Sequence, residues 1–253
     1  SALNTWADRY TDREITGTTQ TVFNGLKLAK EVEYKKDTVE LYDSSFRIQK
    51  VNGEVQKTVD YPVYFRNVAK DKLPEEGSKV SLWATNLSQS INPGWVIILT
   101  PLVVAFFTFL RSRKKEPSTP TKIAFGLLIS ALSVLVMIAA VNMGANGSEK
   151  VSVWWLVANY GVITIGELFL SPMGLSVVSK LSPTNITSLM MGGWFLSTSI
   201  GNKLSGVLAS MWDTYDNKQD FFWINFGLLM FATMLMFILL KQLNKVMQEK
   251  GIH

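Results

Sequence analysis

Glu167 is the residue best placed for chemistry, because it is the only carboxylate inside a long apolar run of this sequence. A charged side chain within a bilayer costs roughly 2.5 to 3.5 kcal/mol or more, so such groups face a partner or a water-filled cavity. Burial raises the pKa of a carboxyl group, and a cationic partner lowers it. Glu167 can therefore exchange a proton within the physiological pH range. We interpret Glu167 as a functional proton- or cation-binding group. The alternative is a fixed ion pair that only joins helices.

Other polar residues share the helical face of Glu167, because they recur at alternating steps of four and three. This face comprises Tyr160, Thr164, Glu167, Ser171 and Gly174. The next apolar run carries a polar and aromatic face typical of a substrate cavity, formed by Trp194, Thr198, Asn202 and Gly206. Beside it, a stripe of small residues predicts close packing of another helix. The stripe comprises Gly193, Ser197, Gly201, Ser205 and Ala209.

The residue inventory argues against enzyme chemistry and metal binding. The chain has no cysteine and one histidine, His253, at its C-terminal end. A thiolate or histidine metal site and a Ser/His nucleophilic pair are therefore not expected. Phosphate-binding loops and the short motifs of zinc proteases and serine hydrolases do not occur either. We expect no catalytic residue, no metal site and no cofactor.

Five long apolar runs position these residues. A hydrocarbon core about 30 Å thick requires roughly 20 apolar residues in helical form. The runs cover residues 91–110, 123–143, 151–178, 189–211 and 221–240. A soluble helix would carry a charged face. We therefore predict an all-α integral membrane protein with five spans. The absence of an initiator Met indicates a segment of something larger.

Basic residues between the spans predict the orientation, because Lys and Arg accumulate in cytoplasmic loops. Residues 111–122 and 241–250 are strongly basic, whereas residues 142–150 and 212–220 are nearly neutral or acidic. The first two segments should be cytoplasmic and the last two external. The net charge of +5 then follows from topology, with contact to membrane lipid, and we expect no nucleic acid partner. The location expected is a cytoplasmic (inner) membrane.

A polar segment, residues 16–87, precedes the spans. Its apolar residues alternate weakly with polar ones, and Asn52-Gly53 between β-rich stretches predicts a hairpin. Because the first span should run inward, this small β-rich segment should be extracytoplasmic. Residues 1–15 are predicted to end an earlier helix, residues 88–245 to hold the spans, and residues 246–253 to form a cytoplasmic tail.

Four strings of this sequence resemble the proton-dependent oligopeptide transporter family, a branch of the major facilitator superfamily. They are similar to that family's helices seven, eight, ten and eleven: SALNTWADRYTDR, SQSINPGWVIILTP, GELFLSPMGLSVVSKLSP and MMGGWFLSTSIGNKLSG. The resemblance implies twelve helices in two halves. This chain would be the C-terminal helix bundle, from the end of helix seven to helix twelve, with the polar segment as an insertion. Its partner would be the N-terminal half of the same transporter.

The resemblance also implies an activity and a set of site residues. The activity is proton-coupled symport of di- and tripeptides by alternating access, powered by a proton gradient. Asn92 would contact the peptide, Glu167 would bind its amino terminus, and Trp194 would line the side-chain pocket. The resemblance also assigns Ser171 and Thr198, on the same helical faces, to the site, but less strongly. The acidic residue of helix seven and the motifs of the first helix lie outside this sequence, so the chain alone should not transport.

Two alternatives remain open. Relatives with the same fold carry other solutes such as nitrate, and many discriminating residues lie in the N-terminal half. In the second alternative, the protein is a membrane-anchored structural or sensory protein whose external polar segment binds a partner. That protein would not require the polar face around Glu167.

Overall fold

The computed structural model describes residues 2–43, 46–183 and 185–249, with the side chains at 171–173, 175–176 and 180–181 outside the description. His253 therefore lies outside the described residues. The chain divides into two compact units. The loop unit consists of Ser1–Ile91, Ala139–Val157 and Ser210–Asp220. The helix unit consists of Asn92–Ile138, Ala158–Ala209 and Phe221–His253.

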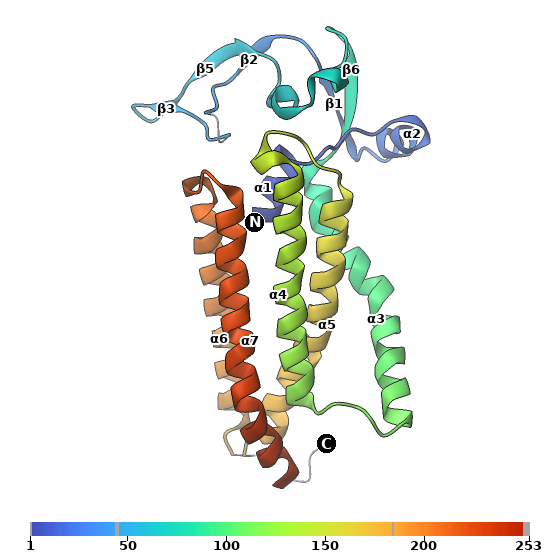
Figure 1. Cartoon of the computed structure of the whole chain (residues 1–253), viewed down its shortest axis with the longest axis vertical. Coiled ribbons are helices and arrows are strands. Elements are labelled where there is room, and N and C mark those ends of the chain that lie inside the picture. Colours follow the sequence, from blue (N-terminus) through green and yellow to red (C-terminus); the bar gives the residue numbers. More distant parts are fainter. Residues whose placement is uncertain (1, 44–45, 184, 250–253) are drawn as a thin grey trace. The chain divides into compact units, whose positions relative to one another are not determined.

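Five long helices occupy the positions of the five predicted spans (Figure 1). They are α3 (Ser88–Ser112), α4 (Thr119–Met143), α5 (Trp154–Leu181), α6 (Thr187–Ser210) and α7 (Lys218–Glu249). Among the described residues, three helical stretches are long and apolar enough to cross a membrane: Thr85–Ser112, Thr119–Met143 and Lys218–Glu249. α5 is apolar over Trp154–Leu170. Because α7 continues to Glu249, the segment predicted as a tail from residue 246 begins as helix.

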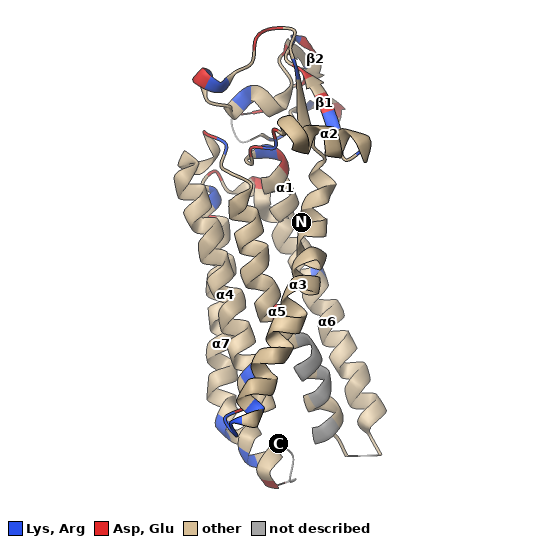
Figure 2. Ribbon diagram, turned by 90° about the vertical axis from the view of Figure 1, so that its right-hand side faces the viewer, with Lys and Arg blue, Asp and Glu red and all other residues tan. Residues whose placement is uncertain are grey.

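Charged residues are sparse along these helices. Figure 2 shows the helices largely without charge and Lys and Arg gathered near the C-terminal end of α7. There, within the helix unit, Glu116 joins the two helices on either side of it. It accepts hydrogen bonds from Arg111 Nε at 2.6 Å and from Lys122 Nζ at 2.5 Å. The bond from Arg111 is the main reason that the pKa of Glu116 falls to about 2. Glu116 thus pairs with one basic residue at the end of α3 and with one in the first turn of α4.

Within the helix unit, the backbones of α4 and α5 approach each other closely. A Cβ atom on Gly126 would lie 2.9 Å from the carbonyl oxygen of Gly166, and one on Gly166 would lie 2.9 Å from that of Gly126. Small residues allow such an approach between membrane helices. The sequence predicted this role for the small-residue stripe of α6 instead. No described atom would come within 4 Å of a Cβ on Gly193 or Gly201, so no described helix packs on these two glycines and the role of the stripe stays a prediction.

The loop unit begins with a short helix, α1 (Ala2–Arg9). The chain then becomes extended, and Thr11 forms a parallel bridge with Val151. The backbone N–H of Asp12 donates to the carbonyl of Val151 at 2.8 Å, and that of Val151 donates to the carbonyl of Tyr10 at 2.9 Å. These bonds use backbone groups that a continuing helix would need. The helix therefore ends at Arg9, earlier than the predicted boundary at residue 15.

The polar segment contains three two-stranded antiparallel sheets. β1 (Ala29–Glu33) pairs with β6 (Lys79–Trp83), β2 (Asp37–Glu40) with β5 (Lys57–Asp60), and β3 (Lys50–Val51) with β4 (Glu54–Val55). The turn between β3 and β4 is Asn52-Gly53, with φ of 53° and 85°. Positive φ at both positions is the requirement of the type I′ turn that connects twisted strands. The predicted hairpin is confirmed.

The polar segment, which was expected to be β-rich as a whole, also contains a helix. Gly17–Gly25 (GTTQTVFNG) forms α2, although threonine and valine favour strands. Only Gln20 and Phe23 are partly buried there, three residues apart as on one helical face. Gln20 donates a hydrogen bond of 2.9 Å to the hydroxyl of Ser81. Contacts with the rest of the unit thus override a weak strand propensity.

An apolar core holds the polar segment together, formed by Tyr64, Phe65, Val80 and Leu82. The two aromatic residues come from η1 (Val63–Asn67) and the two aliphatic residues from β6. Two further short turns, η2 (Lys70–Lys72) and η3 (Thr85–Leu87), lead towards β6 and α3. Apolar burial of this kind is the main stabilising term in a small folded unit.

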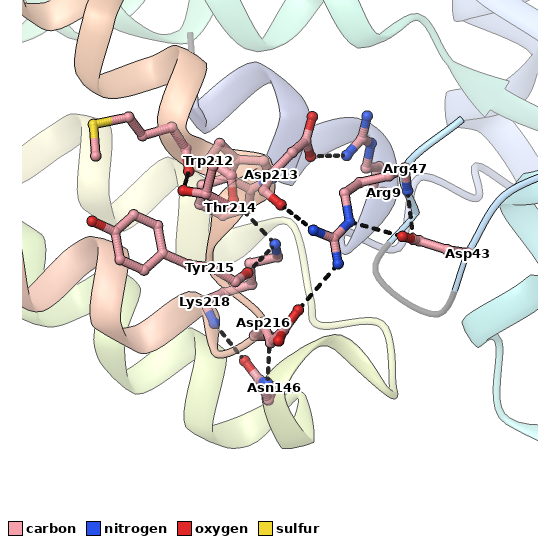
Figure 3. A network of polar contacts seen from close by, with 11 residues as sticks. Arg9, Asp43, Arg47, Asn146, Trp212, Asp213, Thr214, Tyr215, Asp216 and Lys218 are labelled. Carbon is pink, nitrogen blue, oxygen red and sulfur yellow. Dashed lines mark hydrogen bonds and ion pairs between the residues drawn. The ribbon is translucent and has the colours of Figure 1, made fainter. Parts of the chain in front are cut away.

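A polar network ties the polar segment to the connection between α6 and α7, which includes η5 (Met211–Thr214) (Figure 3). Arg47 donates to the Asp43 carboxylate at 2.8 Å, to the carbonyl of Asp213 at 2.7 Å and to the Asp216 carboxylate at 3.1 Å. Arg9 adds an ion pair with Asp213 at 2.9 Å. These contacts join residues far apart in the sequence within the loop unit.

The same network reaches the connection between α4 and α5, which includes η4 (Ala145–Gly147). Asn146 donates to the carbonyl of Asp216 at 3.1 Å and accepts from the backbone N–H of Lys218 at 2.8 Å. Figure 3 shows both bonds. All three segments predicted to be external thus belong to one compact unit.

Lys150 is the most unusual titratable group of the loop unit. Its Nζ lies 4.2 Å from the centre of the Tyr64 ring and donates to the carbonyl of Arg9 at 3.2 Å. Burial, together with the charge of Arg13, lowers the pKa of Lys150 to about 7, against weaker opposite effects of Asp12 and Asp8. Between about pH 7 and 10 the unfolded chain therefore binds more protons at this site than the folded protein.

Stability of the loop unit should therefore rise with pH through this group. Lys150→Met keeps the packing on Tyr64 and removes the charge. We expect its gain in stability over the wild type to be largest near pH 7. Its melting temperature relative to wild type should fall as pH rises from about 7 to about 10. Thermal unfolding of the purified protein at both pH values measures the change. Lys70→Met, at an exposed position of the same unit, is the control. A pH-independent difference for Lys150→Met contradicts the prediction.

Candidate functional site

The candidate site lies where the start of α3 meets the middle of α5, inside the helix unit. Tyr160, Thr164 and Glu167 follow one another at helical spacing on one face of α5, as the sequence predicts. Thr164 is fully buried, and its hydroxyl lies 2.6 Å from the carbonyl oxygen of Tyr160. Bonding to the preceding turn is the usual way in which a threonine is accommodated inside an apolar helix.

Asn92 connects the two helices through its side-chain amide. Its Nδ2 donates a hydrogen bond of 3.1 Å to Oε2 of Glu167. Its Oδ1 lies 3.1 Å from the hydroxyl of Thr164 and accepts from it. These two contacts fix the amide orientation, with its donor group towards the carboxylate. The structure therefore brings together Asn92 and Glu167, which the sequence selected separately.

Trp95, which the sequence analysis did not select, positions α3 against α5. A Cβ atom on Gly161 would lie 3.2 Å from Cε2 of Trp95, so the ring packs on a position that has no side chain. Trp95 follows Asn92 by three residues and therefore shares its side of α3. The sequence contained a sign of this contact. Gly161, which has no side chain, lies three residues before Thr164 and six residues before Glu167.

Glu167 remains available to bind a ligand. Its side chain is exposed, and no ion pair among the described residues includes it. The fixed ion pair considered as an alternative is thus not formed within the described chain. Since Asn92 occupies one carboxylate oxygen, the other can bind a proton or an ammonium group.

Trp194, on α6, packs against α5 further along from Glu167. A Cβ atom on Gly174 would overlap the ring of Trp194, so this ring covers the glycine closely. Gly174 follows Glu167 by seven residues, which corresponds to about 10 Å along the helix axis. Trp194 therefore provides an aromatic surface about two turns from the carboxylate.

The remaining predicted site residues are less closely connected. Thr198 is exposed, and its hydroxyl donates to the carbonyl of Trp194 at 3.1 Å. Ser171 belongs to α5, but its side chain lies outside the described residues. α6 also carries Lys203, a charged residue in an apolar run that the sequence analysis passed over. Nine residues from Trp194, it lies on the opposite face of α6.

Comparison with known proteins identifies the family. Residues 84–224, which include both helices of the site, match the POT family. The chain belongs to the POT family. POT proteins are transporters, and this chain is a multi-pass membrane protein with the helical fold of that family. The resemblance seen in the sequence is thereby confirmed.

The similar curated POT proteins include named peptide permeases. The chain is 36% identical over 132 residues to dipeptide and tripeptide permease A of Proteus mirabilis, and the match covers 52% of this chain and 26% of the permease. It is equally similar to the permease A of Escherichia coli K12, with the same coverage. The match thus spans about a quarter of the length of these relatives.

Solved structures of POT proteins have the same fold. A peptide transporter POT in complex with sulfate matches with a TM-score of 0.58 and 29% identity, over 65% of this chain and 32% of that chain. A POT family transporter in complex with a thioalcohol-conjugated peptide matches with a TM-score of 0.57 over 72% of this chain and 36% of that one. Its 24% identity supports the fold alone.

Proposed function

We propose that this chain forms the C-terminal helices of a transporter that moves di- and tripeptides across a membrane together with protons. The contact of 3.1 Å between Asn92 and Glu167 carries the proposal, because it orients an otherwise unpaired carboxylate within the POT-family match. The permeases named for di- and tripeptides support the substrate class.

Each site residue has a role in this proposal. The Glu167 carboxylate binds the peptide ammonium group, and it accepts a proton when the site is empty. Asn92 holds the carboxylate in place and contacts the peptide backbone. Trp194 lines the side-chain pocket, and Ser171 and Thr198 extend it. Transport breaks no covalent bond, so the proposal includes neither enzyme activity nor a cofactor, and a proton gradient supplies the energy.

The proposed partners follow from the exposed surface of the helix unit. α6 has no buried residue in its described part, and Leu189 and Phe195 are 73% and 60% exposed. Apolar surface of this extent suits membrane lipid or another helix bundle. We propose that the N-terminal half of the transporter supplies the second wall of the site. Nucleic acid has no place in this proposal.

The proposed location is the cytoplasmic (inner) membrane, with the basic connections inside. The grouping of the polar segment with the α4–α5 and α6–α7 connections supports a common, external side for all three.

Uptake by the intact transporter tests the proposed function. In proteoliposomes with an inward proton gradient, a labelled dipeptide should accumulate, because one pH unit stores about 1.4 kcal/mol per proton, enough for about ten-fold accumulation. Unlabelled di- and tripeptides should compete, whereas free amino acids and nitrate should not. A protonophore should abolish the accumulation.

Two results would contradict this function. Competition by nitrate without competition by peptides would assign the protein to the transporters of other solutes. Absence of any solute uptake, combined with a protein partner for the polar segment, would support the anchored binding protein instead.

A further inference from the structure

A second cavity lies in the loop unit, apart from the residues of the proposed transport site. Its volume is about 330 Å³, and its walls come from β2, β5 and η1. Pockets that bind small molecules have volumes of roughly 300 to 1,000 Å³. One lining residue, Phe65, belongs to the apolar core of the polar segment, and two others, Tyr34 and Leu73, pack against that core. The cavity therefore has a firmly packed base.

Aromatic rings form much of this base. Tyr34 and Tyr61 stack with centroids 4.3 Å apart and an angle of 13° between their planes. Phe65 meets Tyr34 edge to face at 4.8 Å. Such rings pack well against an apolar or aromatic side chain, and their faces attract cations.

Charged groups of both signs line the same cavity: Asp60 and Arg66. Neither takes part in an ion pair among the described residues. Asp60 accepts from the N–H of Tyr61 at 2.8 Å through one oxygen and retains the other for a ligand. Glu40 also borders the cavity, but the pairing of Asp37 with Asp60 places the Glu40 side chain on the other face of the two strands, where it accepts from the Tyr42 hydroxyl at 2.9 Å.

Arg66 is held in place while most of its donors remain available. Its Nη1 donates to the carbonyl of Tyr42 at 3.1 Å, and its guanidinium lies 5.4 Å from the centre of the Phe46 ring. A guanidinium carries five N–H donors that match a carboxylate in pairs. A simple anion would meet the Asp60 carboxylate in this cavity, and a simple cation would meet Arg66. A ligand with both charges satisfies the whole lining.

We propose that this cavity binds small zwitterionic peptides that carry an apolar or aromatic side chain. The ammonium group contacts Asp60, the carboxylate contacts Arg66, and the side chain packs on the rings of Tyr34 and Phe65. This proposal rests on the proposed function for its ligand class. It adds a second peptide site to the transporter, formed by other residues than the site of Glu167.

Photo-cross-linking on the intact transporter tests the second site. The probe is a dipeptide with free termini and a benzoylphenylalanine side chain, applied to the Glu167→Gln variant so that the proposed transport site is disabled. Mass spectrometry should locate the cross-link within residues 34–73. Unlabelled phenylalanyl-alanine should suppress it, whereas the same dipeptide with acetylated and amidated ends should not.

Variants assign the contacts. Arg66→Ala and Asp60→Asn should each reduce the cross-link yield about ten-fold, since each removes a charge-assisted hydrogen bond. Arg66→Lys retains the charge and should keep part of the yield if Arg66→Ala fails to fold. Glu54→Gln, an exposed carboxylate beside the β3–β4 turn, is the matched control and should bind as before.

The possible failures are distinguishable. Peptide uptake by the wild-type transporter without a cross-link in residues 34–73 overturns the second site and leaves the proposed function in place. Equal suppression by the blocked dipeptide, or full yield in the charge variants, also overturns it. A cross-link in this segment without any peptide uptake supports the second site and contradicts the proposed function.

Discussion

Glu167→Gln in the intact transporter should reduce proton-driven dipeptide uptake to background. Glutamine preserves the size of the side chain and keeps an oxygen for the hydrogen bond from Asn92, which is 3.1 Å long in the wild type. The substitution removes the charge. Removing one partner of a desolvated charge pair costs about 2 kcal/mol or more, which is at least about 30-fold in binding. Initial rates of uptake under an inward proton gradient measure the effect.

The controls for this variant separate binding from proton coupling. Glu149→Gln, at an exposed carboxylate of the α4–α5 connection, should transport normally. Exchange of labelled for unlabelled peptide without a gradient should also fail in Glu167→Gln if the carboxylate binds the ammonium group. If exchange persists, Glu167 serves the proton alone. Normal accumulation in Glu167→Gln, at normal expression, refutes the assigned role.

Gly166→Val should cause the largest loss of stability in the helix unit. A Cβ at this position would overlap Ser130 Oγ and lie 2.9 Å and 3.1 Å from backbone atoms of Gly126 and Ser130. A side chain could rotate away, but the backbone of α4 cannot, so the two helices must separate. Overpacking of this kind costs typically about 1 to 3 kcal/mol.

Thermal unfolding of the purified protein compares Gly166→Val with a matched control. Gly227→Val places the same side chain in α7, where no described atom lies within 4 Å of the added Cβ. The control should melt close to wild type, whereas Gly166→Val should melt well below it. Because Glu167 is the next residue, uptake should fall as well. Equal melting temperatures of the two variants would show that α4 and α5 do not pack closely here.

The sequence identified the polar face of α5 because polarity inside an apolar run is costly and therefore conspicuous. The same argument, with the POT-like strings, selected Asn92 and Glu167, and the structure places them in contact. The sequence could not predict the close approach of Gly126 to Gly166, because it does not distinguish a glycine that faces another helix from one that faces lipid. The stripe on α6 was chosen instead, and no described residue packs closely on its glycines.

The polar segment was harder to predict for a related reason. The Asn52-Gly53 turn depends on two adjacent residues, so local chemistry was sufficient. α2 depends on contacts with β6, and its threonines alone indicate a strand. The cavity of the polar segment brings Asp60 and Arg66 together through the pairing of β2 with β5 and the turn of η1. Such proximity cannot be read from one sequence without the register.

The Arg47 network has a consequence for the order of assembly during synthesis. Its partners Asp213 and Asp216 follow Arg47 by 166 and 169 residues. At ribosomal rates of about 5 to 20 residues per second, they emerge roughly 8 to 35 seconds later. Until then, Arg47 has only its neighbour Asp43 from this network. The polar segment is therefore synthesised well before the α6–α7 connection that secures it, and its closure waits for the arrival of η5 and the start of α7.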